Sequence, residues 1–239
     1  MKIAALKVLL ACITPFVIVA QQETEIFLLD ILPNEKGVAL GIPLNISNNE
    51  GYDNQPSFLD EDHILFSSTR NGQTDIALYS IPEQTKTWIS NTPGGSEYSP
   101  LKIPGKEAVS AIRLDADGLQ RLYQYDLKTG KSEELLKDLK VSYHVWYNDH
   151  ILVCTVLIEN RMDLVVANIN EGTKYTIEKN VGRSLHKIPN SDLVSFVSKL
   201  GATTAIKSLN PITRATETLQ YLGKGLEDMA WLTENNLLA

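Results

Sequence analysis

The four histidines are the side chains best suited to acid–base or metal chemistry, and their spacing argues against a shared site. His63 and His150 each lie in the sequence DHIL, which therefore occurs twice in the chain. A repeated context predicts a repeated structural role at a turn, whereas the ligands of one zinc ion must converge within about 2 Å of it. His144 and His186 each lie close to the start of a predicted strand. These two are the better candidates for a functional role.

Sequence motifs that mark common active sites do not occur in this chain. There is no Gly-x-Ser-x-Gly elbow, no His-Glu-x-x-His motif and no phosphate-binding glycine loop. The segment LDADG (114–118) is similar to the start of a calcium loop but lacks the glutamate of the twelfth position, so it predicts a hairpin turn. Cys154 lies in the apolar run HILVCTVLI, which indicates a buried small side chain rather than a nucleophile. We therefore predict no catalytic residue, no metal site and no cofactor.

The composition excludes some classes of partner. The chain has 239 residues, 43% of them hydrophobic, which is enough to form a sizeable core. Its formal net charge is -7, and its lysines and arginines form no cluster. Because binding to phosphates requires clustered positive charge, we expect neither a nucleic-acid partner nor binding to an anionic membrane surface.

A repeat organises most of the sequence. Pro56 and Pro100 lie 44 residues apart, and Trp146 and Trp231 lie 85 apart. The two copies of DHIL are 87 residues apart, which corresponds to two repeats of about 43 residues. Each repeat contains four short apolar segments separated by polar turns, some of them Asn-Gly or Asp-Gly. Four strands at this period are typical of the blade of an all-β propeller.

The two ends of the chain read as parts of one further blade. Residues 24–31 and 37–47 resemble the third and fourth strands of the repeat, and residues 227–239 resemble its first two strands. A blade made from both ends would leave no open sheet edge. We thus expect five blades, four full and one composite. The last strand stops within the apolar run NNLLA, so the alternative is a truncated sequence, and the propeller would then have six blades.

The first twenty residues have the pattern of a secretory signal peptide. Lys2 and Lys7 precede an apolar run that ends at Ala20, where we expect cleavage. A transmembrane anchor is disfavoured because the run is short and contains Pro15. The alternative is a lipoprotein anchored through Cys12, in the sequence LLAC. Residues 21–239 then form a single propeller domain, periplasmic or secreted, with no transmembrane segment and too few cysteines for an internal disulfide.

One blade carries a family resemblance. The sequence PSFLDEDHILFSSTRNGQTDIALY (56–79) has a Pro-aromatic pair, then Ser-x-Arg-x-Gly, then Asp-Ile and an aromatic residue. This pattern resembles the TolB-type (WD-type) propeller repeat. In the family this arginine and aspartate belong to the scaffold, which implies a structural ion pair of Arg70 with Asp75. TolB has an α/β domain before its propeller, whereas the residues before the first full blade here read as strands. We therefore expect a propeller without that domain, and the resemblance does not imply a link to the Tol system.

The first strand of each blade lines the central channel of a propeller, so the residues leading into these strands are the candidate binding site. They combine acidic side chains and tyrosines, which suit a peptide, a sugar or a cation. Alternatively, they satisfy backbone groups at the strand starts. The candidates are Tyr52, Asp53, Asn54, Glu97, Tyr98, Tyr143, His144, Arg183, Ser184, Glu227 and Asp228.

These features predict a non-catalytic, exported TolB-like propeller that binds another protein of the bacterial cell envelope. The alternative is a propeller-type enzyme or binding protein for carbohydrate or another small ligand. In that case His144 or His186 would act with carboxylates at the channel mouth as acid and base. The sequence leaves the oligomeric state open.

Overall fold

Four antiparallel sheets of four strands make up most of the molecule. The computed structural model describes residues 23–34, 37–223, 226–233 and 236–238. Blade 1 contains β5 (Asp53–Phe58), β6 (His63–Arg70), β7 (Gln73–Ser80) and β8 (Thr85–Trp88). Blade 2 contains β9 (Ser96–Lys102), β10 (Ala108–Leu114), β11 (Gln120–Asp126) and β12 (Ser132–Glu134). Blade 3 contains β13 (Val141–Trp146), β14 (Ile151–Ile158), β15 (Arg161–Asn168) and β16 (Thr173–Glu178). Blade 4 contains β17 (Val181–Lys187), β18 (Val194–Ser198), β19 (Ala205–Leu209) and β20 (Thr216–Tyr221).

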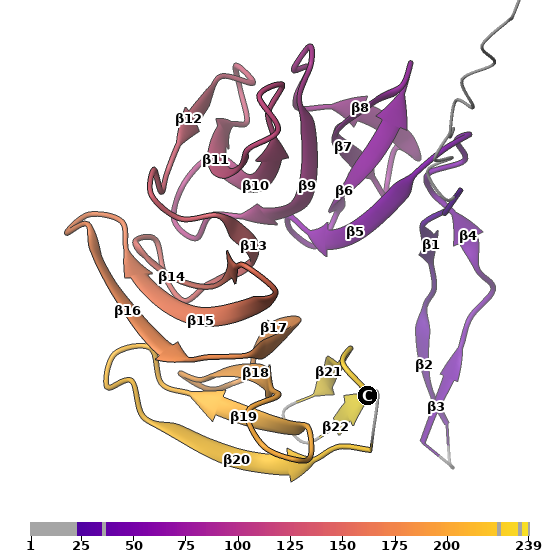
Figure 1. The fold of residues 1–239 in the computed structure, drawn as a ribbon. Helices are drawn as coiled ribbons and strands as arrows, with labels where there is room; N and C mark the ends of the chain where they lie inside the picture. Colours follow the sequence, from indigo (N-terminus) through magenta and orange to yellow (C-terminus); the bar gives the residue numbers. More distant parts are fainter. Residues whose placement is uncertain (1–22, 35–36, 224–225, 234–235, 239) are drawn as a thin grey trace, which may run out of the picture.

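The blades follow one another around an arc, with their first strands toward the centre (Figure 1). The strands of each blade pair in chain order, as expected for a β-propeller. This confirms the all-β propeller predicted from the repeat. No helix in the described part of the chain is long and apolar enough to cross a membrane.

Local turn chemistry explains the hairpins. Arg70 pairs with Gln73, so only Asn71 and Gly72 connect β6 to β7. Both connecting residues have positive φ, 51° and 76°. A two-residue loop of this kind matches the right-handed twist of the strands, which is why Asn-Gly is favoured there.

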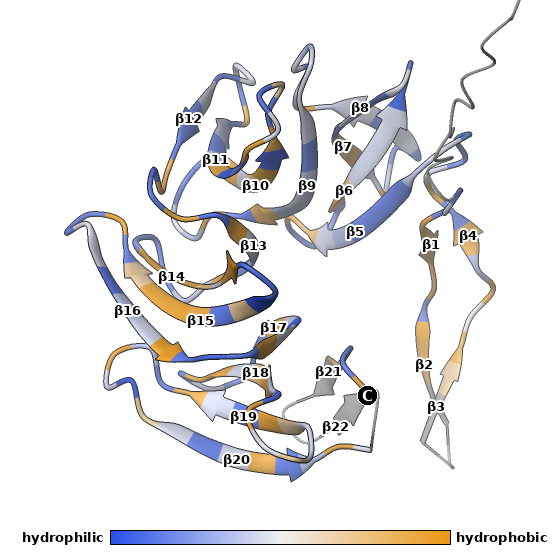
Figure 2. Ribbon diagram, viewed as in Figure 1, coloured by the Kyte–Doolittle hydropathy of each residue, from blue (hydrophilic) through white to orange (hydrophobic). Residues whose placement is uncertain are grey.

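The hydrophobic core lies between neighbouring blades. Leu65 and Ile76 of blade 1 pack with Val109 and Tyr125 of blade 2, and similar clusters join the later pairs. Hydrophobic residues concentrate on β14 and β15 (Figure 2), whose side chains contribute to the two clusters flanking blade 3. Cys154 is fully buried in one of these clusters, as predicted.

A hydrogen bond between blades recurs with the repeat. The indole N–H of Trp146 donates to the hydroxyl of Ser110 at 2.8 Å, and Trp231 donates to Ser195 at the same distance. In each pair the tryptophan follows the serine by 36 residues and belongs to the next sheet along the chain. The hydrogen bonds therefore tie the inner part of one sheet to its neighbour.

The ends of the chain form separate two-stranded sheets. β1 (Phe27–Leu28) pairs with β4 (Leu44–Asn45), and β2 (Ile31–Asn34) pairs with β3 (Gly37–Leu40). Together they form a ribbon that stands apart from the arc (Figure 1). At the other end, β21 (Ala230–Thr233) pairs with β22 (Asn236–Leu238). Within the described residues four blades are complete, and the composite fifth blade stays a prediction.

The end of the ribbon that contains Thr24 and Ile46 is attached to blade 1. Thr24 forms a parallel bridge with Tyr52, and the backbone N–H of Ile26 donates to Ser47 at 2.9 Å. Ile26 and Ile46 are buried in the cluster that includes Phe66 of blade 1. The predicted signal peptide, with Ala20 and Cys12, lies outside the described residues.

Candidate functional site

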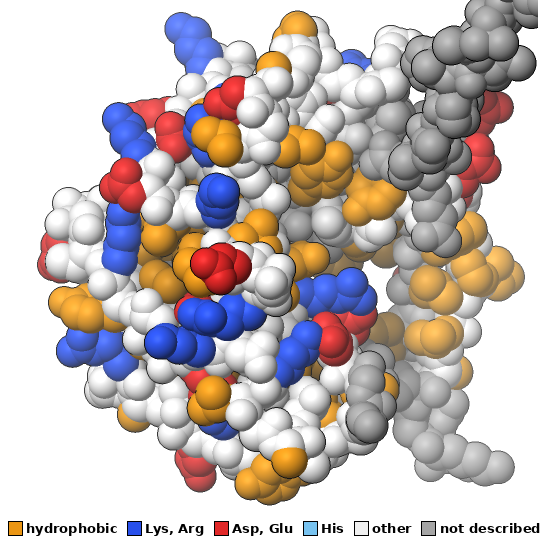
Figure 3. All heavy atoms as spheres, viewed as in Figure 1, with side chains coloured by type: hydrophobic (Ala, Val, Ile, Leu, Met, Phe, Trp, Pro, Cys, Tyr) orange, Lys and Arg blue, Asp and Glu red, His pale blue; other side chains and the backbone are white. Residues whose placement is uncertain are grey.

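The first strands of all four blades surround one cavity of about 490 Å³. Residues from the segment that follows blade 4 complete its wall. Basic and acidic side chains are interleaved on the face of the molecule drawn in Figure 3. The lining residues are Tyr52, Asn54, Gln55, Pro56, Ser99, Leu101, Tyr143, His144, Arg183, Ser184, Leu185, His186, Asp228 and Met229.

The structure brings together most of the predicted site residues, but not all of them. Tyr98 lines an adjoining cavity of about 190 Å³, which Tyr143 also lines. Glu227 lines a groove beside Arg183, and its carboxylate lies 2.6 Å from the ammonium of Lys199. Those that line the central cavity are Tyr52, Asn54, Tyr143, His144, Arg183, Ser184 and Asp228.

Asp53 and Glu97, both expected at the channel mouth, are instead buried away from the cavity. Asp53 is 1% exposed and lies where the ribbon joins blade 1, next to Thr24. Asn49 donates to one oxygen of its carboxylate at 3.1 Å, and the other oxygen has no partner among the described residues. Burial raises the pKa of Asp53.

Glu97 is fully buried between blades 1 and 2 and accepts hydrogen bonds from two hydroxyl groups. Tyr125 donates to it at 2.9 Å and Ser90 at 3.2 Å. Burial raises the pKa of Glu97, and the nearby charge of Asp75 raises it further. Because Asp53 and Glu97 do not reach the cavity, its wall is less acidic than the sequence suggested.

His144 is buried in the cavity wall and contacts Ser110. Its side chain is 5% exposed, and its Nε2 lies 2.7 Å from the hydroxyl of Ser110, which also accepts the indole N–H of Trp146. Burial lowers the pKa of His144 to about 3, so the imidazole is neutral at physiological pH. The sequence pointed to this histidine, but its partners became visible only in the folded chain.

Arg183 and Asp228 form an ion pair at the edge of the cavity. The guanidinium Nε donates to one carboxylate oxygen at 2.7 Å, and Nη2 donates to the other oxygen. This hydrogen bonding lowers the pKa of Asp228 and raises that of Arg183. The pair is more than half exposed, so its stabilising effect is small, but it holds two opposite charges where a ligand can reach them.

His186 and Ser184 form the wall beside this pair. Nε2 of His186 lies 3.1 Å from the hydroxyl of Ser184, which also exchanges hydrogen bonds with the backbone of Met229. Burial lowers the pKa of His186. At neutral pH His186 is therefore uncharged and can accept or donate a hydrogen bond.

Three tyrosines lie close together at the rim. The rings of Tyr52 and Tyr98 meet edge to face, with their centroids 6.1 Å apart. Burial raises the pKa of Tyr52, and proximity to Tyr98 and Tyr143 adds to the effect. Such a group offers apolar faces and hydroxyls together, which suits contact with a peptide or a sugar.

Sequence reasoning missed Gln55 and Ser99, which line the same cavity. Both have positive φ, 56° and 51°, and each lies where the pairing of the first strand with the second shifts. The amide oxygen of Gln55 accepts hydrogen bonds from the backbone N–H of Ser99 at 2.9 Å and from Ser67 at 3.1 Å. One feature of the sequence could have indicated these two residues: each is followed by a proline, and Gln55-Pro56 and Ser99-Pro100 occupy the same place in two repeats.

The ion pair of Arg70 with Asp75 was predicted as part of the scaffold. The two side chains lie 2.9 Å apart, and Asp75 is fully buried. In blade 3 the equivalent Asp163 pairs instead with Arg161 of its own strand, at 2.8 Å. The contact of Arg70 with Asp75 confirms the predicted pair and places it away from the cavity lining.

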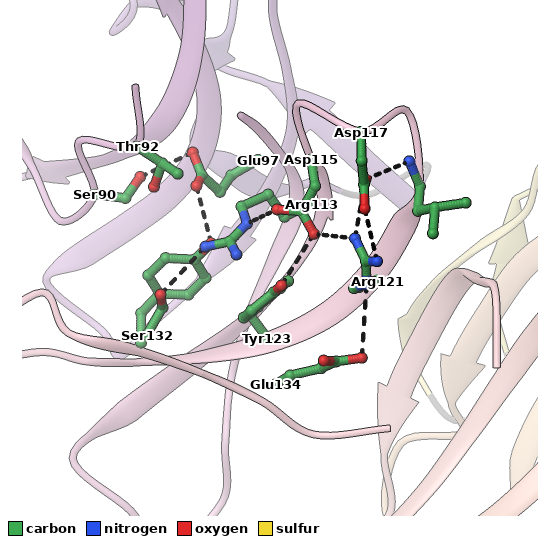
Figure 4. Close-up of polar contacts among 12 residues, drawn as sticks. Ser90, Thr92, Glu97, Arg113, Asp115, Asp117, Arg121, Tyr123, Ser132 and Glu134 are labelled. Carbon is green, nitrogen blue, oxygen red and sulfur yellow. Dashed lines mark hydrogen bonds and ion pairs between the residues drawn. The ribbon is translucent and has the colours of Figure 1, made fainter. Parts of the chain in front are cut away.

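The LDADG segment is a hairpin turn, as predicted, and its carboxylates are occupied by arginines. Gly118 donates its backbone N–H to the carbonyl of Asp115 at 2.9 Å. Arg121 binds Asp115 at 2.7 Å and Asp117 at 2.8 Å, and Arg113 binds Asp115 from the other side (Figure 4). Guanidinium groups thus take the place that a cation would need. No group of potential metal ligands occurs in the part of the chain that the structure describes.

His63 and His150 lie at equivalent turns, in agreement with the repeated motif. His63 contacts Asp60 at 2.8 Å, and His150 contacts Asp149 at 2.6 Å. Neither histidine lines the central cavity.

Comparison with known proteins supports the fold. No protein-family model and no curated protein sequence matches this chain. Among solved structures it is similar to TolB from Acinetobacter baumannii, with a TM-score of 0.62 and 17% identity, over 80% of this chain and 50% of that one. It is also similar to a candidate TolB from Agrobacterium tumefaciens, with a TM-score of 0.55 and 15% identity, over 77% of this chain and 71% of that one.

An enzyme has a similar fold. A puromycin-hydrolyzing peptidase from Mycobacterium tuberculosis matches with a TM-score of 0.58 and 12% identity, over 80% of this chain and 31% of the peptidase. The chain therefore spans about half of the Acinetobacter TolB and less than a third of the peptidase. At these identities the matches establish a TolB-like β-propeller fold, which confirms the predicted resemblance. They do not distinguish binding from catalysis, because one fold hosts many functions.

Proposed function

We propose that this chain is an exported, non-catalytic TolB-like propeller that binds another protein of the bacterial cell envelope at its central cavity. The observation that carries the proposal is the cavity itself. Each of the four complete blades contributes to its wall, which combines tyrosines, amides and one exposed pair of opposite charges. Such a mixed surface suits an inserted peptide segment, whose backbone and side chains need both polar and apolar contacts.

The groups best suited to catalysis are poorly placed for it. His144 has a pKa of about 3 and is fixed by Ser110, so it is a weak base. Cys154 is buried, and burial raises the pKa of its thiol to about 12. These properties favour binding over chemistry.

Affinity capture tests the proposal. We would use the tagged chain, residues 21–239, to capture partners from a cross-linked envelope fraction, and identify them by mass spectrometry. Arg183→Asp should lose a partner that binds at the cavity. The double variant Arg183→Asp with Asp228→Arg, which restores the ion pair, should recover part of the binding.

The matched control is Lys128→Asp, which makes the same change of charge at an exposed turn of blade 2. It should retain the partner. If Lys128→Asp and Arg183→Asp behave alike, the cavity is not the binding site. If the folded protein captures nothing specific, the protein-binding function is wrong.

The alternative is a carbohydrate-binding protein or enzyme. His186 and Asp228 line the same cavity, and the charge of Asp228 raises the pKa of His186 against the effect of burial. They could therefore act as a base and a carboxylate on a bound sugar. Binding to a glycan array, or cleavage of a glycan that His186→Ala abolishes, would favour this alternative.

We also propose that the ribbon and the β21–β22 sheet are the two halves of one composite blade, which makes five blades, or six if the sequence is truncated. The ribbon exposes large apolar side chains, including Ile42 at 93% and Leu40 at 69%. Closure of the ring would cover them and remove the open edges. In such a blade β1 would be the neighbour of β22, so a cysteine at Phe27 should cross-link within one chain under oxidation with a cysteine at Asn236, Leu237 or Leu238. Failure of all three pairs to cross-link in the folded monomer would argue against closure.

Export is part of the same proposal. The mature protein should begin at Gln21 in the periplasm or the medium, which N-terminal sequencing of that fraction can determine. A lipid-modified Cys12 in the membrane fraction would support the lipoprotein alternative instead.

A further inference from the structure

The protonation of His144 can be assigned from its neighbours. The hydroxyl oxygen of Ser110 accepts the indole N–H of Trp146, which can only donate. The closest acceptor for the proton of Ser110 is Nε2 of His144 at 2.7 Å, compared with the carbonyl of Leu101 at 3.4 Å. If Ser110 donates to Leu101, the proton of the neutral ring lies on Nε2; if it donates to the nearer Nε2, the proton lies on Nδ1. We infer the second arrangement from the shorter contact.

This Nδ1–H has no partner among the described residues, although the atom is buried. Buried donors are normally hydrogen-bonded, because an unsatisfied one is costly. His144 lines the central cavity, but Nδ1 itself is covered, so a bound molecule can supply the missing acceptor only if the neighbouring side chains shift.

The repeat shows that the imidazole is not needed for the blade. His144 occupies the place of Pro100 in blade 2, 44 residues before it, and of Pro56 in blade 1, another 44 residues before that. Proline at the same place supports the same strand, and Pro56 lines the same cavity. The histidine therefore adds a hydrogen-bond donor that the scaffold does not require.

Gln55 provides a second fixed donor. The backbone N–H of Ser99 donates to one end of the Gln55 amide. Because a donor must meet an acceptor, that end is the oxygen and the other end is the nitrogen. The hydroxyl of Ser67 also binds this oxygen. The amide nitrogen is thereby left to donate elsewhere, in a residue that lines the cavity together with His144.

Neither donor carries charge, and the charges of Arg183 and Asp228 neutralise each other at the edge. A carboxylate buried at His144 would lose its hydration without gaining an opposite charge, whereas a neutral carbonyl would not incur this cost. We propose that the cavity binds an amide carbonyl of a peptide segment, whose oxygen accepts the Nδ1–H of His144. This inference rests on the proposed protein-binding function and specifies the group that is recognised.

Nuclear magnetic resonance of the unaltered chain, with ¹⁵N-labelled histidine, tests the assignment. His144 should show a protonated Nδ1, and the resonance should move on titration with N-acetylglycine N-methylamide. Sodium acetate, the charged analogue, should move it less. A proton on Nε2, or no response to the amide probe, would overturn the proposal. A response to N-acetylglucosamine but not to the peptide amide would overturn the assignment to a peptide.

Variants link the inference to the captured partner. His144→Phe keeps a ring but removes the donor and should weaken binding of the amide probe about tenfold. His150→Phe, at an exposed turn, is the matched control and should bind as the unaltered chain does. If the envelope partner binds His144→Phe undiminished, this inference fails while the proposed function stands. If the probe binds but no envelope protein does, the protein-binding function fails.

Discussion

Removal of the Ser110 hydroxyl should destabilise the protein more than removal of any isolated surface hydroxyl. Ser110 is fully buried between blades 2 and 3, where it accepts from Trp146 and lies within hydrogen-bonding distance of His144. In Ser110→Ala both partners stay buried and lose their hydrogen bond. The cost is the desolvation of two polar groups and not merely the loss of one contact.

The magnitude follows from the number of groups left unpaired. Each buried polar group without a partner costs about 1–3 kcal/mol, so with two such groups we expect Ser110→Ala to lower the free energy of unfolding by about 2–6 kcal/mol. Ser195 is the internal control, because it pairs with Trp231 in the same way but has no imidazole partner. Because only one group is left unpaired, Ser195→Ala should lower the free energy of unfolding by about 1–3 kcal/mol.

Urea unfolding followed by circular dichroism measures both values, since this signal does not depend on the altered tryptophan environment. A double-mutant cycle of Ser110→Ala with Trp146→Phe isolates the hydrogen bond. Trp146→Phe should lower the free energy of unfolding less when residue 110 is alanine than when it is serine. If Ser110→Ala costs no more than Ser195→Ala, or the cycle shows no coupling, the reasoning about the shared hydroxyl is wrong.

Three further predictions concern single groups. Because burial raises the pKa of Glu97, the folded state keeps a proton that the unfolded state releases above pH 4.5. The free energy of unfolding should therefore fall as the pH rises from there. In urea unfolding, Glu97→Gln should show a smaller decrease of this free energy with pH. Cys154, with a pKa of about 12, should react with a thiol reagent in urea but not in the native protein, and rapid native reaction would contradict its burial. Asp228→Asn should change the free energy of unfolding by less than about 1 kcal/mol, because its pair with Arg183 is exposed, and a larger loss in the same urea assay would show that the pair supports the fold.

The repeat and its turns could be predicted because they depend on local chemistry. Residues such as Asn71 and Gly72 set a hairpin through their own backbone preferences, and short apolar segments recurring at one period must form equivalent strands. The pair of Arg70 and Asp75 follows in the same way, since both flank one hairpin. The composite blade depends on contacts between distant ends, and the described strands do not decide it.

The candidate site was predicted only in part, because the orientation of a side chain on a strand depends on register. Side chains alternate between the two faces, so a shift of one residue turns a channel residue into an interior one. The first strands of blades 1 and 2 bulge at Gln55 and Ser99, two residues after Asp53 and Glu97. The side chains before and after each bulge therefore do not follow one simple alternation. The sequence by itself determined the strands, their order and the presence of His144 at a proline position. Only the tertiary structure decided which side chains meet in the cavity, because that depends on bulges and on contacts between blades far apart in the chain.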